Sequence, residues 1–272
     1  MAGLRQTIAR ERHAWHGPPE RRRARAERTH PARQLLESPP RDGRAVRAVR
    51  DAAVIRAVIF DFDGLILETE MPALQSWSEI YKEHGHEVPM DLWHGYIGSD
   101  RGFEPVEHLA ALVGEGLDKV VTQTRRDKRK NELVAALDLM DGVRQYVDDA
   151  TRLELRLGIA SSSTRAWVLG HLERLGFAAC WHTVKAREDV ARPKPAPDLY
   201  VAAVDALGVA PHEALALEDS PNGIAAAKGA GLRCVAVPNP LTAGMDLSGA
   251  DLRIGSLAAT PLESVLAVLA RD

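Results

Sequence analysis

The residues best suited to chemistry are two carboxylates that follow an apolar run ending at residue 60. Asp61 and Asp63 are separated by one residue, and the glycine after them, Gly64, permits a sharp turn. Carboxylate oxygens are ligands that suit Mg²⁺, a hard cation. The pair could therefore hold a magnesium ion, although a solvated acidic turn would explain the same residues.

A second acidic pair has the same placement further along the chain. Glu218 and Asp219 close another apolar run and stand just before Pro221, a residue favoured in the first turn of a helix. Either a metal ion or the N-terminus of that helix could be the partner of these acids. The pair alone does not decide between metal binding and helix capping.

Two further segments could bind an anion. Ser161 and Ser162 belong to a run of four hydroxyl residues. Hydroxyls at a helix start can bind phosphate together with free backbone N–H groups, or they can cap the helix. Lys194 lies between two prolines, which limit its backbone freedom. It could be a fixed cation for an anionic ligand, or a solvated lysine in a proline-rich turn.

The elements that must position these residues alternate in type. Runs typical of buried parallel strands occupy 54–60, 155–160, 183–184, 214–217 and 234–237. Helical patterns occupy 164–175, 197–207, 221–230 and 261–270. This alternation predicts an α/β fold with a doubly wound parallel sheet. Each of the four polar segments follows a predicted strand, and ligands of such sheets bind at the carboxyl ends of strands. We therefore expect the segments to converge in one crevice.

Two stretches depart from the alternation. Residues 72–140 contain helical patterns without a strand, which predicts a helical domain inserted into a core formed by 51–71 and 141–272. Residues 1–50 hold 13 Arg, 5 acidic residues, several prolines and almost no apolar periodicity. Such a segment cannot bury enough surface to offset the entropy of ordering, so we expect a disordered extension. Trp167, like the tryptophans of the inserted stretch, is expected to be a packing residue.

Charge and composition narrow the function classes. The chain beyond residue 50 holds 22 basic and 33 acidic residues, a balance of −11. That balance argues against a nucleic-acid partner, because binding to nucleic-acid backbones depends on clustered Lys and Arg. No apolar run approaches the ~20 residues that cross a membrane, and no secretory signal is recognisable. We expect a cytoplasmic monomer that acts on a small molecule.

Together the four segments resemble the motifs of the haloacid dehalogenase (HAD) superfamily, in the branch that includes β-phosphoglucomutase and small sugar-phosphate phosphatases. The resemblance covers about residues 54–270. Asp61–Ile66 resembles the first motif, Ser161 the second, Lys194 the third, and Glu218 with Asp219 the fourth. The helical stretch is similar to the cap domain of that family in type and place. The resemblance implies a HAD-like Rossmannoid core with an inserted helical cap.

The resemblance also implies a reaction, which is phosphoryl transfer from a small phosphorylated metabolite. Asp61 would be the nucleophile and form an aspartyl phosphate, which is a recognised use of carboxylates. Asp63 would protonate the leaving alkoxide and then deprotonate the incoming water. Ser161 would bind a phosphate oxygen with Ser162 beside it, and Lys194 would neutralise charge on the phosphate and on Asp61.

A magnesium ion is the cofactor that the resemblance implies. Its ligands would be the carboxylates of Asp61 and Asp219 and the backbone carbonyl of Asp63, with Glu218 assisting. The resemblance places a loop of the cap at the active site, where Arg101 could bind the non-reacting end of the substrate. An exposed surface arginine would explain Arg101 equally well.

Three functions remain to be weighed. A phosphatase and a phosphosugar mutase would share all the core residues. Mutase relatives carry a histidine shortly after the first motif, and residues 70–73 contain none, which favours the phosphatase. By the resemblance, Glu68 lies in a flap beside the active site, where the family often has Asp. The resemblance therefore does not specify the geometry of this flap. A non-catalytic binding protein is the third hypothesis, and the complete set of acids, hydroxyl and lysine argues against it.

Overall fold

The computed structural model describes residues 55–97 and 103–271. The extension predicted for residues 1–50 and the cap residue Arg101 lie outside the described residues. No helix in those two ranges is long and apolar enough to cross a membrane.

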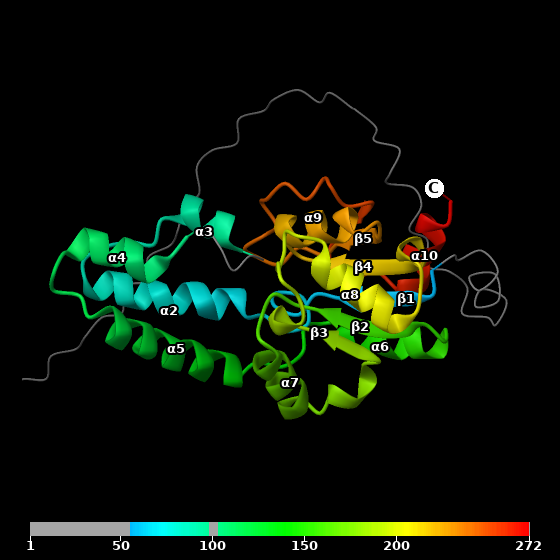
Figure 1. The fold of residues 1–272 in the computed structure, drawn as a ribbon, viewed down its shortest axis with the longest axis horizontal. Coiled ribbons are helices and arrows are strands. Elements are labelled where there is room, and N and C mark those ends of the chain that lie inside the picture. Colours follow the sequence, from blue (N-terminus) through cyan, green and yellow to red (C-terminus); the bar gives the residue numbers. More distant parts are fainter. Residues whose placement is uncertain (1–54, 98–102, 272) are drawn as a thin grey trace, which may run out of the picture. The chain divides into compact units, whose positions relative to one another are not determined.

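A parallel β-sheet forms the centre of the described core (Figure 1). Its strands are β1 (Ala57–Phe60), β2 (Arg156–Ala160), β3 (Thr183–Lys185), β4 (Ala214–Glu218), β5 (Arg233–Ala236) and β6 (Leu252–Arg253). Their order across the sheet is β3-β2-β1-β4-β5-β6, and every neighbouring pair is parallel. The predicted doubly wound sheet is confirmed. Strand β1 lies between β2 and β4, so the polar segments after these three strands share one edge.

Alternating side chains explain why the strands are apolar without interruption. In β1, Val58 and Phe60 belong to one buried cluster, whereas Ala57 and Ile59 belong to another on the opposite face. Helices cover both faces, as parallel sheets require. The first cluster includes residues of α6 (Val143–Arg152), α7 (Arg165–Arg174) and α10 (Leu262–Leu269). The second includes residues of α8 (Asp198–Leu207) and α9 (Pro221–Gly229).

Two elements of the core were not predicted. Strand β6 has only two residues, too few for a periodic pattern to appear. Helix α6 carried a readable signal, because Val143, Tyr146, Val147 and Ala150 are buried at the spacing of one helix face. The ends of the remaining strands and helices of the core agree with the predicted ends to within one residue, except that β1 begins at Ala57 and was predicted from residue 54. Short 3₁₀ turns complete the core at η2 (Ala178–Cys180), η3 (Arg187–Asp189) and η4 (Pro211–Glu213).

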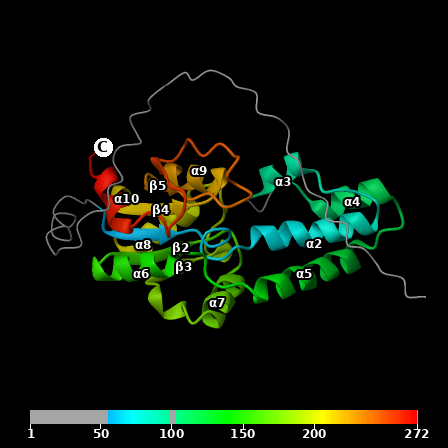
Figure 2. The same cartoon turned by 180° about the vertical axis from the view of Figure 1, so that it is seen from behind.

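A helical insertion separates β1 from β2, as expected from the missing strands in this stretch. It comprises α2 (Glu70–Glu83), α3 (Met90–Tyr96), α4 (Pro105–Val113) and α5 (Lys119–Ala135). Helices α2 and α5 run side by side in both views (Figures 1 and 2). The insertion has an apolar cluster of its own, which includes Trp77, Tyr81 and Trp93. The boundaries proposed for this cap, 72–140, stay a prediction.

Candidate active site

The first acidic residue is held at the end of β1 by the sheet itself. The Asp61 backbone N–H donates to the Leu217 carbonyl at 3.0 Å, so the residue continues the β1–β4 pairing. Asp61 is only 7% exposed, which rules out a solvated turn. Gly64 has φ +82, and a Cβ on it would lie 2.4 Å from Asp219 Oδ2. Glycine is therefore required for the loop after β1 to approach the second acidic pair.

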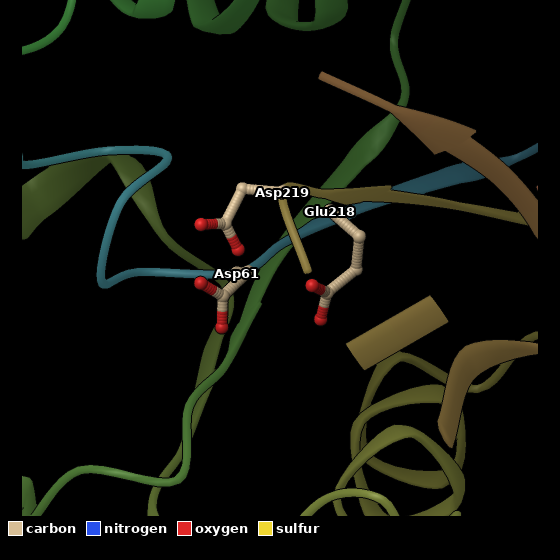
Figure 3. Close-up of side chains that lie close together, drawn as sticks. All are labelled: Asp61, Glu218 and Asp219. Carbon is tan, nitrogen blue, oxygen red and sulfur yellow. The ribbon is translucent and has the colours of Figure 1, made fainter. Parts of the chain in front are cut away.

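Three carboxylates converge where β1 and β4 end (Figure 3). Oxygen atoms of Asp61, Glu218 and Asp219 all lie within 4.8 Å of one another, and the three residues are buried. Asp219 also accepts a hydrogen bond from Asn239 Nδ2 at 2.7 Å. Ser220, rather than either acid, caps α9 by accepting from the Gly223 backbone N–H at 3.1 Å. The acidic pair is thus left for the carboxylate cluster.

Lys194 binds this cluster from the loop before α8. Its Nζ donates to Asp61 Oδ1 and, at 2.5 Å, to Glu218 Oε1. Tyr200 on α8 donates its hydroxyl to the same Glu218 oxygen at 2.6 Å. A Cβ on Gly223 would lie 1.9 Å from Glu218 Oε2, so this glycine makes room for the carboxylate. Lys194 is 2% exposed and is therefore a fixed buried cation, not a solvated lysine.

When its three acids are ionised, the cluster carries more negative than positive charge. Burial, with Glu218 and Asp63 nearby, raises the pKa of Asp61 from 3.8 to about 8 although Lys194 opposes the shift. Burial and the neighbouring carboxylates likewise raise the pKa of Asp219 well above 3.8. Burial opposes the charged form of Lys194, but Asp61 and Glu218 raise its pKa above 10.5. Three buried carboxylates facing one ammonium fit a hard divalent cation, which would relieve their repulsion.

This charge imbalance predicts how pH and Mg²⁺ act on stability. The folded-state pKa of Asp61 lies above the unfolded value, so the folded protein binds this proton more tightly. Without metal, the free energy of unfolding should therefore fall as pH rises from about 4 to about 8. At pH 8, Mg²⁺ at 100 times its Kd should restore ~2.7 kcal/mol. That gain corresponds to a rise in Tm of about 5–10 °C.

Thermal unfolding after chelation, with and without added Mg²⁺, checks this prediction at pH 5 and pH 8. The Mg²⁺ effect should be smaller at pH 5, where protons compete for the carboxylates. Asp219→Asn should lose most of it, whereas Asp205→Asn, a change at an exposed residue of α8, should keep it. If the Tm at pH 8 did not change on addition of Mg²⁺, this result would contradict a metal site at the three carboxylates.

The hydroxyl segment contacts Asp63, the second acidic residue after β1. Asp63 Oδ2 accepts from Ser163 Oγ at 2.6 Å and from Ser161 Oγ at 3.3 Å. Asp63 Oδ1 accepts from Thr69 Oγ1 at 2.7 Å and from Trp167 Nε1 at 2.9 Å. The expectation that Trp167 packs is confirmed, because its side chain packs against the first buried cluster, and its N–H in addition donates to a predicted catalytic carboxylate.

Helix capping was the alternative role for the hydroxyl run, and only the last residue of the run performs it. Thr164 caps α7 by accepting from the Trp167 backbone N–H at 3.3 Å. The other hydroxyls are therefore free of that task. Ser162 lines the pocket described next, and its buried Oγ has no hydrogen-bonding partner within the described ranges. A phosphate oxygen is a group that could satisfy such a hydroxyl.

A pocket of about 500 Å³ lies between the core and helices α2 and α5. Its core wall includes Asp61, Asp63, Ser162, Ser163, Trp167 and Lys194. Its cap wall includes Glu70 and Ala73 from α2 and Arg126, Lys130 and Asn131 from α5. Burial, followed by the charge of nearby Asp63, raises the pKa of Glu70 to about 7. Burial lowers the pKa of Lys130. The cap thus presents polar and charged groups to the same space as the acids.

The predicted site residues of the core meet at one edge of the sheet. Asp61, Glu218, Asp219 and Lys194 form one contact network, and Asp63 with Ser161 forms a second network beside it. Four partners escaped the sequence reasoning: Tyr200, Asn239, Trp167 and Thr69. Asn239 follows strand β5, so the strand-end rule could have found it. Nothing in the sequence separates Tyr200 or Trp167 from ordinary apolar helix positions.

Comparison with known proteins gives consistent matches. The family model described as haloacid dehalogenase-like hydrolase matches residues 58–237. YhcW of Bacillus subtilis, which bears a provisional phosphatase name, is 41% identical over 214 residues, covering 78% of this chain and 97% of that protein. The phosphorylated carbohydrates phosphatase of Thermotoga maritima is 27% identical over 219 residues, covering 79% and 98%.

Solved structures agree with the sequence matches. CbbY from Rhodobacter sphaeroides in complex with phosphate has a TM-score of 0.62 and 29% identity, covering 75% of this chain and 95% of that one. A variant of the same protein in complex with xylulose 1,5-bisphosphate has a TM-score of 0.60 and 28% identity, with the same coverage. The ligands in those structures are phosphate and a sugar bisphosphate.

Proposed function

The chain belongs to the haloacid dehalogenase-like hydrolase family, and from this membership we propose that it is a magnesium-dependent phosphatase of small sugar phosphates. The proposed reaction proceeds through an aspartyl phosphate on Asp61. The observation that carries the proposal is the contact of Lys194 with Asp61 in a pocket whose core wall also bears seryl hydroxyls. A pocket of about 500 Å³ is of the size that holds a small metabolite.

The residues would divide the first step of the reaction between them. Asp61 attacks phosphorus, so an O–P bond forms to the carboxylate while the bond to the leaving oxygen breaks. Asp63 gives a proton to the leaving alkoxide. Lys194 offsets charge on Asp61 and on the phosphate, and the hydroxyls of Ser161 and Ser162 donate to phosphate oxygens.

The second step returns Asp61 to its starting state. Asp63 takes a proton from water as the water oxygen bonds to phosphorus, and the bond between phosphorus and Asp61 breaks. Helices α2 and α5 would limit the access of bulk water to the pocket. The site offers an Mg²⁺ ion the carboxylates of Asp61, Glu218 and Asp219, with the Asp63 carbonyl as a further proposed ligand. When bound, this ion would offset the repulsion between an anionic nucleophile and an anionic phosphate.

Two features of the cap wall support a sugar phosphatase over a mutase. Ala73 of α2 lines the pocket where the sequence lacks the mutase-type histidine, and no histidine lines the pocket among residues 55–97 and 103–271. A mutase must hold water off the aspartyl phosphate until the sugar rebinds, and the mutase-type histidine is missing from this wall among the described residues. Glu70, Lys130 and Asn131 provide hydrogen-bonding groups that suit sugar hydroxyls. The names of the similar proteins from Thermotoga and Rhodobacter point to the same substrate class.

Product analysis tests the proposal. With Mg²⁺ present, a screen of hexose, pentose and triose phosphates should give free inorganic phosphate from at least one member and none after chelation. β-Glucose 1-phosphate with a bisphosphate primer is the decisive substrate for the alternative, and both phosphate and isomeric sugar phosphate are measured. Rapid formation of glucose 6-phosphate without phosphate release would overturn the phosphatase and support the mutase.

A further inference from the structure

The two oxygens of the Asp63 carboxylate have different surroundings. Among residues 55–97 and 103–271, Oδ2 accepts only from seryl hydroxyls, those of Ser161 and Ser163. Oδ1 accepts from Thr69 and from the indole N–H of Trp167, neither of which belongs to the proposed phosphate-binding set. With two donors on each oxygen, the four acceptor positions of the carboxylate are filled. Four fixed donors define one orientation of this side chain.

Substrate would change only half of this arrangement. One hydroxyl on Oδ2, that of Ser161, is proposed to bind a phosphate oxygen, and the other, that of Ser163, lines the same pocket, so an arriving phosphate competes with Oδ2 for them. The donors on Oδ1 are not among the groups proposed to bind phosphate. Oδ2 would then be released beside the phosphate while Oδ1 keeps its partners. An acid that must reach the leaving oxygen benefits from this division, because one oxygen is anchored and the other is free to react.

We propose that Trp167 is a positioning residue for the reaction: its indole N–H anchors Oδ1 of Asp63 so that Oδ2 faces the leaving oxygen of the substrate. The inference rests on the proposed phosphatase function and adds to it a residue that belongs to neither the proposed phosphate-binding set nor the proposed metal ligands. Thr69 shares the anchoring, but it also adjoins the first turn of α2. Trp167 lies in the first turn of α7, within the core, and therefore provides an anchor independent of that helix.

The ring of Trp167 also contacts the cap. Lys130 of α5 places its Nζ 4.2 Å from the centroid of the indole ring. A cation on the ring face is attracted to the π electrons, and it withdraws electron density from the ring. The N–H on that ring becomes a stronger donor, as in other polarised hydrogen-bond chains. The hydrogen bond from Trp167 to Asp63 is consequently strongest when α5 lies over the Trp167 ring. The orientation of Asp63 therefore depends on the position of the cap.

Leaving-group dependence tests the proposal in the full-length protein with Mg²⁺. Phenyl phosphate and p-nitrophenyl phosphate have similar shapes, but phenolate needs a proton to leave whereas p-nitrophenolate is a stable anion. Trp167→Phe should lower kcat/KM about tenfold for phenyl phosphate, the size expected for a hydrogen bond to a charged group, and less than about threefold for p-nitrophenyl phosphate. Equal losses for the two esters would indicate a merely structural role and overturn the proposal, as would no loss.

Two companion variants separate the N–H from the ring. Benzothienylalanine at position 167 replaces the indole N–H by sulfur but keeps the bicyclic ring under Lys130, and it should reproduce the selective loss. Trp181→Phe is the matched control, since Trp181 packs edge-on against Phe60 and donates to the Phe177 carbonyl, outside the pocket. This variant should change kcat/KM by less than about twofold for both esters. Full activity with benzothienylalanine would also overturn the proposal.

The indole proton gives a readout that needs no turnover. The Nε1–H resonance of Trp167 is identified as the one that is present in the NMR spectrum of the wild type and absent from that of Trp167→Phe. A hydrogen bond to a carboxylate shifts that resonance downfield, so Asp63→Ala should move it upfield. An unchanged resonance would refute the anchor. If no aryl or sugar phosphate is hydrolysed, the proposed phosphatase function fails, while this resonance still decides whether Trp167 holds Asp63.

Discussion

Asp61→Asn should abolish phosphate release, with kcat reduced by at least about a thousandfold, which corresponds to ~4 kcal/mol of lost transition-state stabilisation. The amide has nearly the shape of the carboxylate but is not a nucleophile, so no aspartyl phosphate can form. The fold should persist because the backbone of Asp61 keeps its bond to Leu217. Burial already raises the pKa of this carboxyl, so a neutral side chain should leave the metal-free Tm at pH 8 equal to or above that of the wild type.

Steady-state phosphate release checks the expected loss of kcat, and thermal unfolding of the same preparation checks the expected Tm. Asp205→Asn makes the same chemical change at an exposed site on α8 and should leave kcat and Tm unchanged. If Asp61→Asn retained more than about a tenth of kcat, which is a loss below ~1.4 kcal/mol, Asp61 would not be the nucleophile.

Lys194→Met should show the second largest effect, in which activity and stability fall together. Methionine cannot donate to Asp61 or Glu218, which leaves buried carboxylates without their ammonium partner. Breaking a buried ion pair from one side costs about 3–5 kcal/mol. The loss should appear in metal-free protein at pH 8 and shrink toward pH 5, where the carboxyls take up protons. We expect kcat to fall by at least about a hundredfold, because charge on the phosphate is no longer neutralised.

Urea unfolding at the two pH values, with chelator present, measures the stability part. Lys228→Met is the matched control, because Lys228 pairs with Asp251 at the surface, where its side chain is 36% exposed. Exposed pairs contribute about 0–1 kcal/mol, so this variant should unfold nearly as the wild type does. A Lys194→Met protein with wild-type stability at pH 8 and more than a tenth of the kcat would show that the lysine contact is not needed.

Much of the active-site region could be predicted because one physical rule covers it. Polar residues that follow buried parallel strands must gather at one edge of the sheet. The runs ending before Asp61, Ser161 and Glu218 were readable as strands, and β1 does lie between β2 and β4. The lysine between two prolines could be singled out as well, although its burial could not. A solvated lysine and one buried against Asp61 have the same local sequence.

Helix positions were harder to interpret than strand ends. Trp167 and Tyr200 stand in apolar patterns that predict packing, yet each directs one polar atom to a carboxylate that is proposed to be catalytic or metal-binding. A side chain of mixed character can do both, since its ring packs while its N–H or O–H finds an acceptor. Which acceptor it finds depends on how far its helix is shifted along the sheet. That shift is set by packing over the whole core.

The sequence by itself determined the alternation of strands and helices, the helical insertion and the acids, hydroxyls and lysine at the strand ends. These follow from local patterns of apolarity and from chain order, which are complete in the sequence. Only the tertiary structure decided that Lys194 joins Asp61 to Glu218 and that Trp167 donates to Asp63. It also decided that α5 brings Lys130 to the Trp167 ring. These contacts join residues on different elements, and their distances depend on register, helix rotation and the approach of the insertion to the core.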